Sequence, residues 1–441
     1  MIPRIRAVFA AMLLLLLTGS GTASASASGT GTGTASTPST RTPIEHFVYL
    51  MQGDRTFDHY FGTYPGAEGL PAQARQAIDP KHPDDGLVAP YPLHDATPVS
   101  PGAGPRLVQQ QYNGGRMDSF VAAFERQGRD GRVAMGHYDR RDLPFYWNAA
   151  DRYELFDHYF ASSLDGTRAN RAQWVTDGPD LSGATLFDRL EEAGVSWKFY
   201  VQNYDPKKTY RTTSPTDPAT QTVRVPLLDV PRFVDDPELN SHIADLSEYY
   251  RDLERGTLPA VAYIASSGAG ERSARSIPAG QRLVRQLTSQ LMVSQYWSSS
   301  ALLWSYDGSG GWYDHVKPPA GRGLRVPALL VSPYTARGQV QHGQFEAASA
   351  LRFVEENWGL RKLGGRTTEV RSLAAAFDFR SPPRQAELIP DDAREAALPV
   401  AHRPSPTPVY AVYGGASALV ALLLWRAVLL WRAVRPKWRT S

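Results

Sequence analysis

Three stretches of the sequence place carboxylate or hydroxyl side chains where they could act on a phosphate group. Asp54 follows the apolar run 46–51, and Asp307 ends the run 300–307. Thr167 lies between them along the chain, in a Gly-Thr step that could open a helix. Two carboxylates at strand ends can converge on a hard cation, and a hydroxyl at a helix start can attack or bind phosphate. An aspartate after a strand is, however, at least as often only a capping or turn residue.

The elements that would position these residues alternate between strand and helix patterns. Short apolar runs predict strands, and runs with apolar residues three and four apart predict helices between them. This alternation predicts an α/β fold with a largely parallel central sheet and helices on both faces, and ligands in such folds lie beyond the carboxyl ends of the strands. The predicted strands are residues 46–51, 195–201, 260–264, 300–307 and 326–333, and the clearest helices surround residues 185–193, 283–292 and 347–358.

Composition excludes several classes of site. The chain contains no cysteine, so disulfides, thiolate metal sites and cysteine nucleophiles are excluded. The net charge is +3, but every acidic residue lies between Glu45 and Glu395, so the basic excess belongs to the termini. A mildly acidic body is not the electrostatic footprint of a nucleic-acid-binding protein, and we expect no nucleic-acid partner.

Both ends of the chain have the composition of targeting segments. Arg4 and Arg6 precede an apolar run that is followed by small residues, which is typical of a secretory signal peptide, with an uncleaved anchor as the alternative. The apolar stretch near the C-terminus predicts a single membrane-spanning helix with the C-terminus in the cytoplasm, with an amphipathic surface helix as the alternative. The expected organisation is a signal peptide (1–27), a flexible linker (28–43), one extracytoplasmic domain (44–376), a Pro-rich stalk (377–408), a transmembrane helix (409–431) and a basic tail (432–441).

Several separate motifs carry a family resemblance. They are LMQGDRTFDHYFGTYP at residues 50–65, NGGRMD at residues 113–118 and YDGSGGWYDHVKPP at residues 306–319. Together they resemble the bacterial phosphoesterase family, which contains the non-haemolytic phospholipases C and a related acid phosphatase. The resemblance runs from about residue 44 to 375 and implies an alkaline-phosphatase-like core.

The resemblance also implies roles for individual residues. Family members hold a divalent metal ion against a Ser or Thr nucleophile. Thr167 matches the nucleophile, Asp307 matches a metal-ligating acid and Asp54 matches an asparagine that also binds the ion. The resemblance thus implies Asp54, Asp307 and Thr167 as the metal ligands, and the identity of the ion stays open. The residues expected to support these ligands are Asn170, Arg171, Asp314 and His315.

This sequence departs from the family pattern at several of these positions. Gly53 and Gly308 stand where the family has carboxylate ligands, so the metal site should be weaker and more watery. Arg272 stands where a histidine is expected, and it could clamp a phosphate oxygen. His242 could keep another catalytic histidine position, although a surface histidine on a helix is an equally good interpretation.

Two functions of different classes follow from these observations. In the first, the chain is a membrane-anchored hydrolase of phosphoric esters, including phospholipids, with Thr167 as a metal-assisted nucleophile and His242 and Arg272 as further catalytic groups. In the second, it is a catalytically impaired pseudoenzyme that keeps the fold and acts as a surface binding protein.

Overall fold

A central sheet of eight strands carries the described part of the protein. The computed structural model describes residues 39–94, 102, 104–212, 220–272 and 276–391. In their order across the sheet, the strands are β13 (Gln339–Gln341), β6 (Glu154–Phe156), β12 (Ala328–Val331), β11 (Ser300–Tyr306), β1 (His46–Gln52), β10 (Val261–Ala265), β8 (Trp197–Val201) and β9 (Ile243–Asp245).

The five strands from β11 to β9 run parallel to one another, and β12 runs antiparallel to both β11 and β6. Strand β1 lies in the middle of the parallel part, and six of its seven residues are buried. A strand covered on both faces requires a continuous apolar run, and this is what its sequence has. The five predicted strands are confirmed to within two residues at each end.

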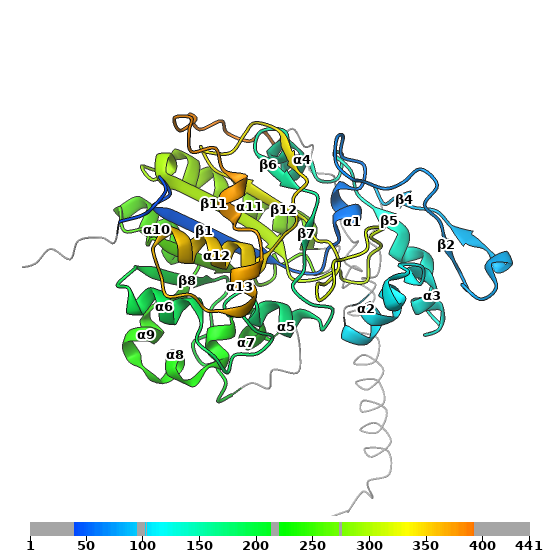
Figure 1. Ribbon diagram of the computed structural model, residues 1–441, viewed down its shortest axis with the longest axis horizontal. Coiled ribbons are helices and arrows are strands. Elements are labelled where there is room, and N and C mark those ends of the chain that lie inside the picture. Colours follow the sequence, from blue (N-terminus) through cyan, green and yellow to red (C-terminus); the bar gives the residue numbers. More distant parts are fainter. Residues whose placement is uncertain (1–38, 95–101, 103, 213–219, 273–275, 392–441) are drawn as a thin grey trace, which may run out of the picture. The chain divides into compact units, whose positions relative to one another are not determined.

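Helices pack on both faces of the sheet (Figure 1). On one face, Phe47 of β1 contacts Phe353, and Tyr49 contacts Trp174. On the other face, Trp304 of β11 packs against Tyr146. The prediction of a largely parallel sheet with helices on both faces is therefore confirmed. The helices of the described residues around the sheet are α4 (Pro144–Ala150), α5 (Thr167–Ala172), α6 (Leu186–Glu192), α7 (Gln221–Arg224), α8 (Pro231–Asp235), α9 (Pro237–Ser241), α10 (Ser247–Arg255), α11 (Ile277–Val293), α12 (Ala347–Asn357) and α13 (Gly365–Glu369).

A smaller apolar cluster lies beside the main core. Phe120 and Phe124 are fully buried there, and Tyr313, which comes from the segment after β11, joins them. This part appears on the right in Figure 1. Its elements are α2 (Pro105–Tyr112), α3 (Phe120–Glu125), β2 (Gln76–Ala77), β3 (Leu87–Val88), β4 (Tyr91–Pro92) and β5 (Gly136–His137), and the chain reaches it through α1 (Phe57–Phe61). The two remaining strands, β7 (Tyr159–Phe160) and β14 (Phe345–Glu346), pair with each other.

The sequence predicted a C-terminal transmembrane helix, and the structure corrects this prediction. None of the helices in the described ranges is both long enough and apolar enough to cross a membrane. The prediction of a single-pass membrane protein is therefore wrong as far as the structure describes the chain. The segments that suggested a signal peptide (1–27) and a membrane helix (409–431) lie outside the described residues.

Helix α5 is tied to the carboxyl edge of the sheet by one buried arginine. The Arg171 side chain donates from Nε to Asp307 Oδ2 at 2.8 Å and from Nη2 to the carbonyl oxygens of Met51 and Gln52 at 3.0 and 3.1 Å. Its side chain is 2% exposed, and that of Asp307 is fully buried. Arg171, in the last turn of α5, therefore joins this helix to the end of β1 and to Asp307, which follows β11.

We expect Arg171→Met to lower the free energy of unfolding by about 3–5 kcal/mol, because the change removes one partner of a buried ion pair and leaves two carbonyl groups without their donor. Arg168→Met is the matched control on the same helix, because Arg168 pairs with Asp229 with 53% of its side chain exposed. Exposed pairs contribute about 0–1 kcal/mol. Urea unfolding of both variants measures the difference, and equal losses would contradict the assigned role of Arg171.

Glu154 of β6 gives the sheet a pH-dependent contribution. Burial raises the pKa of its carboxyl group to about 7, and a hydrogen bond from Gln341 opposes this shift. Since the folded state holds the proton more tightly than the unfolded state, stability is full below the unfolded pKa near 4.5 and is lost as the pH rises toward 7. Glu154→Gln should therefore gain on the order of 3 kcal/mol over wild type between pH 4.5 and 8. Denaturant titrations at both pH values check this, and a difference that does not change with pH would contradict it.

Candidate active site

The structure brings Asp54, Thr167 and Asp307 to one edge of the sheet. Asp54 follows β1, Asp307 follows the neighbouring strand β11, and Thr167 is the first residue of α5. All three residues are at most 6% exposed. They meet at the carboxyl ends of adjacent parallel strands, which is where open α/β sheets form their ligand sites.

A fourth residue, Arg272, connects these three side chains. It lies in the loop after β10, the strand on the other side of β1. Its Nη1 donates to Asp54 Oδ2 at 2.6 Å and to Thr167 Oγ1 at 3.3 Å, and its Nη2 donates to Asp307 Oδ2 at 2.6 Å. One planar guanidinium group therefore contacts both carboxylates and the hydroxyl.

Burial shifts the protonation equilibria of this cluster. Desolvation raises the pKa of Asp54, while the positive charge of Arg272 acts in the opposite direction. Desolvation lowers the pKa of Arg171, and the nearby charge of Asp307 opposes that change. In both cases burial penalises the charged form and the partner restores part of the loss. The cluster holds two carboxylates and two guanidinium groups, so its formal charges balance.

The loops that present Asp54 and Arg272 have an unusual backbone. Asp54 and Glu271 have φ angles of 66° and 60°, which side-chain-bearing residues adopt only where the surroundings hold them. The two loops are joined by a hydrogen bond from the Gly53 amide to the Gly270 carbonyl oxygen, 2.9 Å long. Strain at this position is typical of a functional site.

Glu271 anchors the loop from the side opposite to Arg272. Its fully buried carboxylate accepts hydrogen bonds from the hydroxyl groups of Tyr60 and Tyr306 at 2.7 and 2.9 Å, and also from Tyr146. Burial raises the pKa of Glu271, and these hydrogen bonds oppose the shift. Arg55 completes the group, because it donates to Tyr60 at 3.0 Å and to the Asp54 carbonyl oxygen at 2.7 Å.

The residues that we expected to support the site do so in different ways. Arg171 touches Asp307 directly. Asn170 bonds to both backbone groups of Ser163 and fixes the turn before Thr167. Asp314 and His315 instead form a buried network with Asp58 and Arg325 around the start of α1. In the described part of the chain they hold the segment after Asp54 and form no hydrogen bond with the three central side chains.

The structure does not bring His242 to this edge of the sheet. It follows α9 and precedes β9, so it lies at the amino end of the parallel strands. Its ring stacks on Trp197 with a centroid distance of 4.5 Å, and Nδ1 lies 2.8 Å from the Trp197 carbonyl oxygen. His242 therefore lies at the opposite end of the parallel strands from Asp54, Thr167 and Asp307, and this position does not support the catalytic role that the sequence suggested for it.

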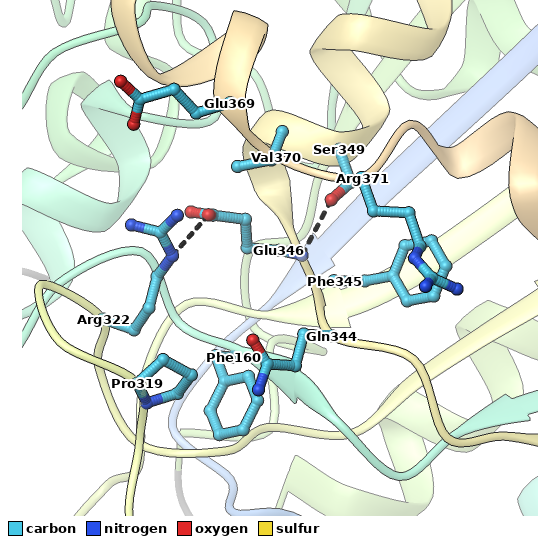
Figure 2. A pocket seen from close by; sticks show the side chains of 10 residues that line it. All are labelled: Phe160, Pro319, Arg322, Gln344, Phe345, Glu346, Ser349, Glu369, Val370 and Arg371. Atoms are coloured by element: carbon cyan, nitrogen blue, oxygen red, sulfur yellow. Dashed lines mark hydrogen bonds and ion pairs between the residues drawn. The ribbon is translucent and has the colours of Figure 1, made fainter.

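Two cavities are relevant to ligand binding. One, of about 200 Å³, adjoins the cluster and is lined by Arg171, Arg224, Ser266 and Arg272, among others. A larger one, of about 320 Å³, shares no residue with the cluster. Figure 2 shows this larger cavity around Glu346, whose carboxylate pairs with Arg322 at 2.5 Å. Of these two cavities, the smaller one adjoins the cluster, because Arg171 and Arg272 line it.

Several groups of the described residues could hold a metal ion, and the predicted ligands are not among them. In each group the candidate ligand atoms lie within 4.8 Å of one another; the groups are Asp157, His158 and His342; Asp58, Asp314 and His315; Asp79, His82 and Asp85; and His94, Asp139 and Asp142. Arg272 lies where a divalent cation shared by Asp54, Thr167 and Asp307 would lie, because the Oδ2 atoms of both carboxylates accept from it. Asp307 Oδ1 is buried and has no hydrogen-bond partner among the described residues, so a cation would have to displace the guanidinium group to use these ligands.

The sequence left two parts of the site unrecognised. Arg224 of α7 faces the smaller cavity, but it comes from an irregular segment that carries no motif. The tyrosines around Glu271 lie far from it along the chain, at positions that resemble ordinary core residues. The sequence offered one indication of their role, which is that they are tyrosines: a buried tyrosine hydroxyl requires a hydrogen-bond partner.

Comparison with known proteins agrees with the motifs. The Phosphoesterase family model matches residues 44–361. Phospholipase C B and phospholipase C A of Mycobacterium tuberculosis are 29% and 28% identical to this chain, over 82% and 78% of this chain and 83% and 79% of theirs. The non-hemolytic phospholipase C of Burkholderia pseudomallei is 27% identical, over 83% of this chain and 63% of that protein. Since the family model matches well over half of the sequence, the chain belongs to the Phosphoesterase family and is a hydrolase of phosphoric esters.

Proposed function

We propose that Thr167 is the nucleophile of this hydrolase. The observation that carries the proposal is that one nitrogen atom, Arg272 Nη1, contacts both the Thr167 hydroxyl and the Asp54 carboxylate. A hydroxyl becomes a nucleophile only when a neighbouring group takes its proton or lowers its pKa. Here both kinds of group, a carboxylate and a cation, lie next to Thr167.

The chemistry then takes two steps. Thr167 Oγ1 gives up its proton and forms a bond to phosphorus, the bond from phosphorus to the ester oxygen breaks, and the group that accepted the Thr167 proton passes it to the leaving alcohol. Asp54 is the candidate to accept the hydroxyl proton, because its carboxylate shares Arg272 Nη1 with the Thr167 hydroxyl and because burial raises its pKa, which makes the carboxylate a stronger base. Water then attacks the phosphothreonine, which releases phosphate or a phosphomonoester and restores the hydroxyl. Arg171 and Arg272 supply positive charge where the oxygen atoms on phosphorus become more negative.

The cavity next to the cluster suits an anionic substrate. Three arginines line it, and Glu271, which also lines it, directs its carboxylate to buried tyrosines. Arginine binds phosphate oxygens with two parallel hydrogen bonds, so it is the side chain best suited to this group. The relatives named above are phospholipases C, and we propose a phospholipid phosphodiester as the substrate on that basis.

One observation favours a second function. Both amino groups of Arg272 already bind carboxylates, so this residue offers less free charge to a substrate than an unpaired arginine would. A family member in that condition could bind phosphate-bearing ligands without turning them over. This is the pseudoenzyme alternative, and it differs from the first proposal in the turnover it predicts.

We expect Thr167→Ala to lower turnover at least ~10³-fold, because it removes the attacking oxygen, and Thr167→Ser to keep a measurable rate and a phosphorylated intermediate. The assay compares a chromogenic phosphate monoester, a chromogenic diester and a short-chain phosphatidylcholine. Thr368→Ala, at an exposed position in α13, is the matched control and should keep the wild-type rate.

Two results would change these conclusions. Wild-type turnover in Thr167→Ala would rule out Thr167 as the nucleophile. Wild-type protein that hydrolyses none of the three substrates, but binds a phosphate analogue at the cavity, would favour the pseudoenzyme.

A further inference from the structure

We propose that the Arg272 guanidinium group takes the place of a divalent cation in this site, so that the chain acts on phosphate without a metal ion. This inference rests on the proposed function of the same site and deepens it. It concerns which positive charge the two carboxylates hold. Three observations support it: the contacts of Arg272, the space beside Gly53 and the balance of charge.

The contacts of Arg272 are those that a bridging cation would make. Asp54 Oδ2 and Asp307 Oδ2 each lie 2.6 Å from one of its amino groups, and Thr167 Oγ1 lies 3.3 Å from Nη1. The arginine therefore lies among the three side chains that the sequence predicts as metal ligands. It is also held in place, because only 23% of its side chain is exposed.

Arg272 occupies the space that a side chain at position 53 would need. A Cβ atom added to Gly53 would lie 2.8 Å from Arg272 Cγ, 3.1 Å from Nε and 3.2 Å from Cζ. Separations of this kind force a neighbour to move. A side chain at position 53 and the observed position of Arg272 thus exclude each other, and the glycine is what admits the arginine.

Charge balance argues in the same direction. Asp54 and Asp307 carry two negative charges, and Arg171 and Arg272 carry two positive charges against them. A divalent cation would add two further positive charges to a group in which both carboxylates are less than 10% exposed. Like charges repel strongly where water does not screen them. Position 308 adds no carboxylate to offset this repulsion, since it is a glycine.

A guanidinium group can supply the same kind of help as a cation. It is planar, stays charged at any physiological pH and binds the oxygen atoms of phosphate in pairs. Unlike a bound ion, it cannot be removed by a chelator. Turnover that survives chelation therefore follows directly from the inference.

The first experiment measures metal binding and needs no catalytic activity. The full chain is dialysed against EDTA and titrated calorimetrically with Mg²⁺, Mn²⁺, Zn²⁺ and Ca²⁺, in wild type and in Asp54→Asn. We expect the same stoichiometry in both, because ions bound by the His and Asp groups elsewhere do not depend on Asp54. The double variant Gly53→Glu/Arg272→Ala should gain one divalent-ion site, because it removes the Arg272 guanidinium group and adds a carboxylate. It should bind the ion at least ~10-fold more tightly at this position than wild type does.

The second experiment measures turnover of the chromogenic diester. Wild-type turnover should change less than twofold after EDTA treatment. Arg272→Ala should lose ~10²–10³-fold, as when one oxyanion donor is removed, and added guanidinium should restore part of the rate. Arg380→Ala is the matched control, because the Arg380 side chain is 96% exposed and far along the chain from the site. Circular dichroism of each variant confirms that it is folded.

The outcomes separate this inference from the proposed function. A divalent ion that wild type binds and Asp54→Asn loses would overturn the inference, as would turnover that EDTA abolishes and a divalent ion restores. If wild type shows no turnover at all, the proposed hydrolytic mechanism fails, but the calorimetric comparison still decides whether Arg272 excludes a metal ion. That comparison requires only wild type and Asp54→Asn, so it holds even if the double variant does not fold.

Discussion

The site depends on one buried carboxylate, Asp307, whose Oδ2 atom forms ion pairs with both Arg171 and Arg272. Arg171 brings α5 and the end of β1 to this carboxylate, and Arg272 brings the loop after β10. These elements are far apart in the sequence, so interactions between residues near one another along the chain cannot bring them together. A charged group that loses its water on folding must be paired with an opposite charge. Because Arg171 lies on the helix that Thr167 begins, and because Arg272 also binds Asp54, the pairing of Asp307 with both arginines fixes the position of Thr167 relative to Asp54.

A second buried network keeps the two strained loops in place. Glu271 is held by three tyrosine hydroxyl groups, and Arg55 connects this group to the Asp54 carbonyl oxygen. The left-handed backbone at Asp54 and Glu271 is unfavourable by itself. The network offsets that strain, so Arg272, the next residue after Glu271, has a defined direction toward the carboxylates.

The sequence predicted the sheet well because the central strands are buried on both faces, which leaves continuous apolar runs such as residues 46–51. It also placed Asp54, Thr167 and Asp307 near one another, since the ends of neighbouring parallel strands share an edge. It could not predict what Arg272 binds, because that depends on a loop conformation and on space left by Gly53. The sequence also did not predict the position of His242, for a different reason. His242 comes just before β9, so it lies at the opposite edge of the sheet from residues such as Asp54 that come just after a parallel strand.

The two glycines at the predicted ligand positions have a common physical meaning once the contacts of Arg272 are known. A glutamate at position 53 would collide with Arg272, and without that glutamate the carboxylates of Asp54 and Asp307 would have little to hold a divalent ion. Arg272 fills the empty space and, together with Arg171, balances the charges of the two carboxylates. Its planar group can share its protons between carboxylates and a phosphate oxygen, whereas a bound ion would require vacant coordination positions. Glycine at positions 53 and 308 is therefore compatible with a site that still attracts phosphate.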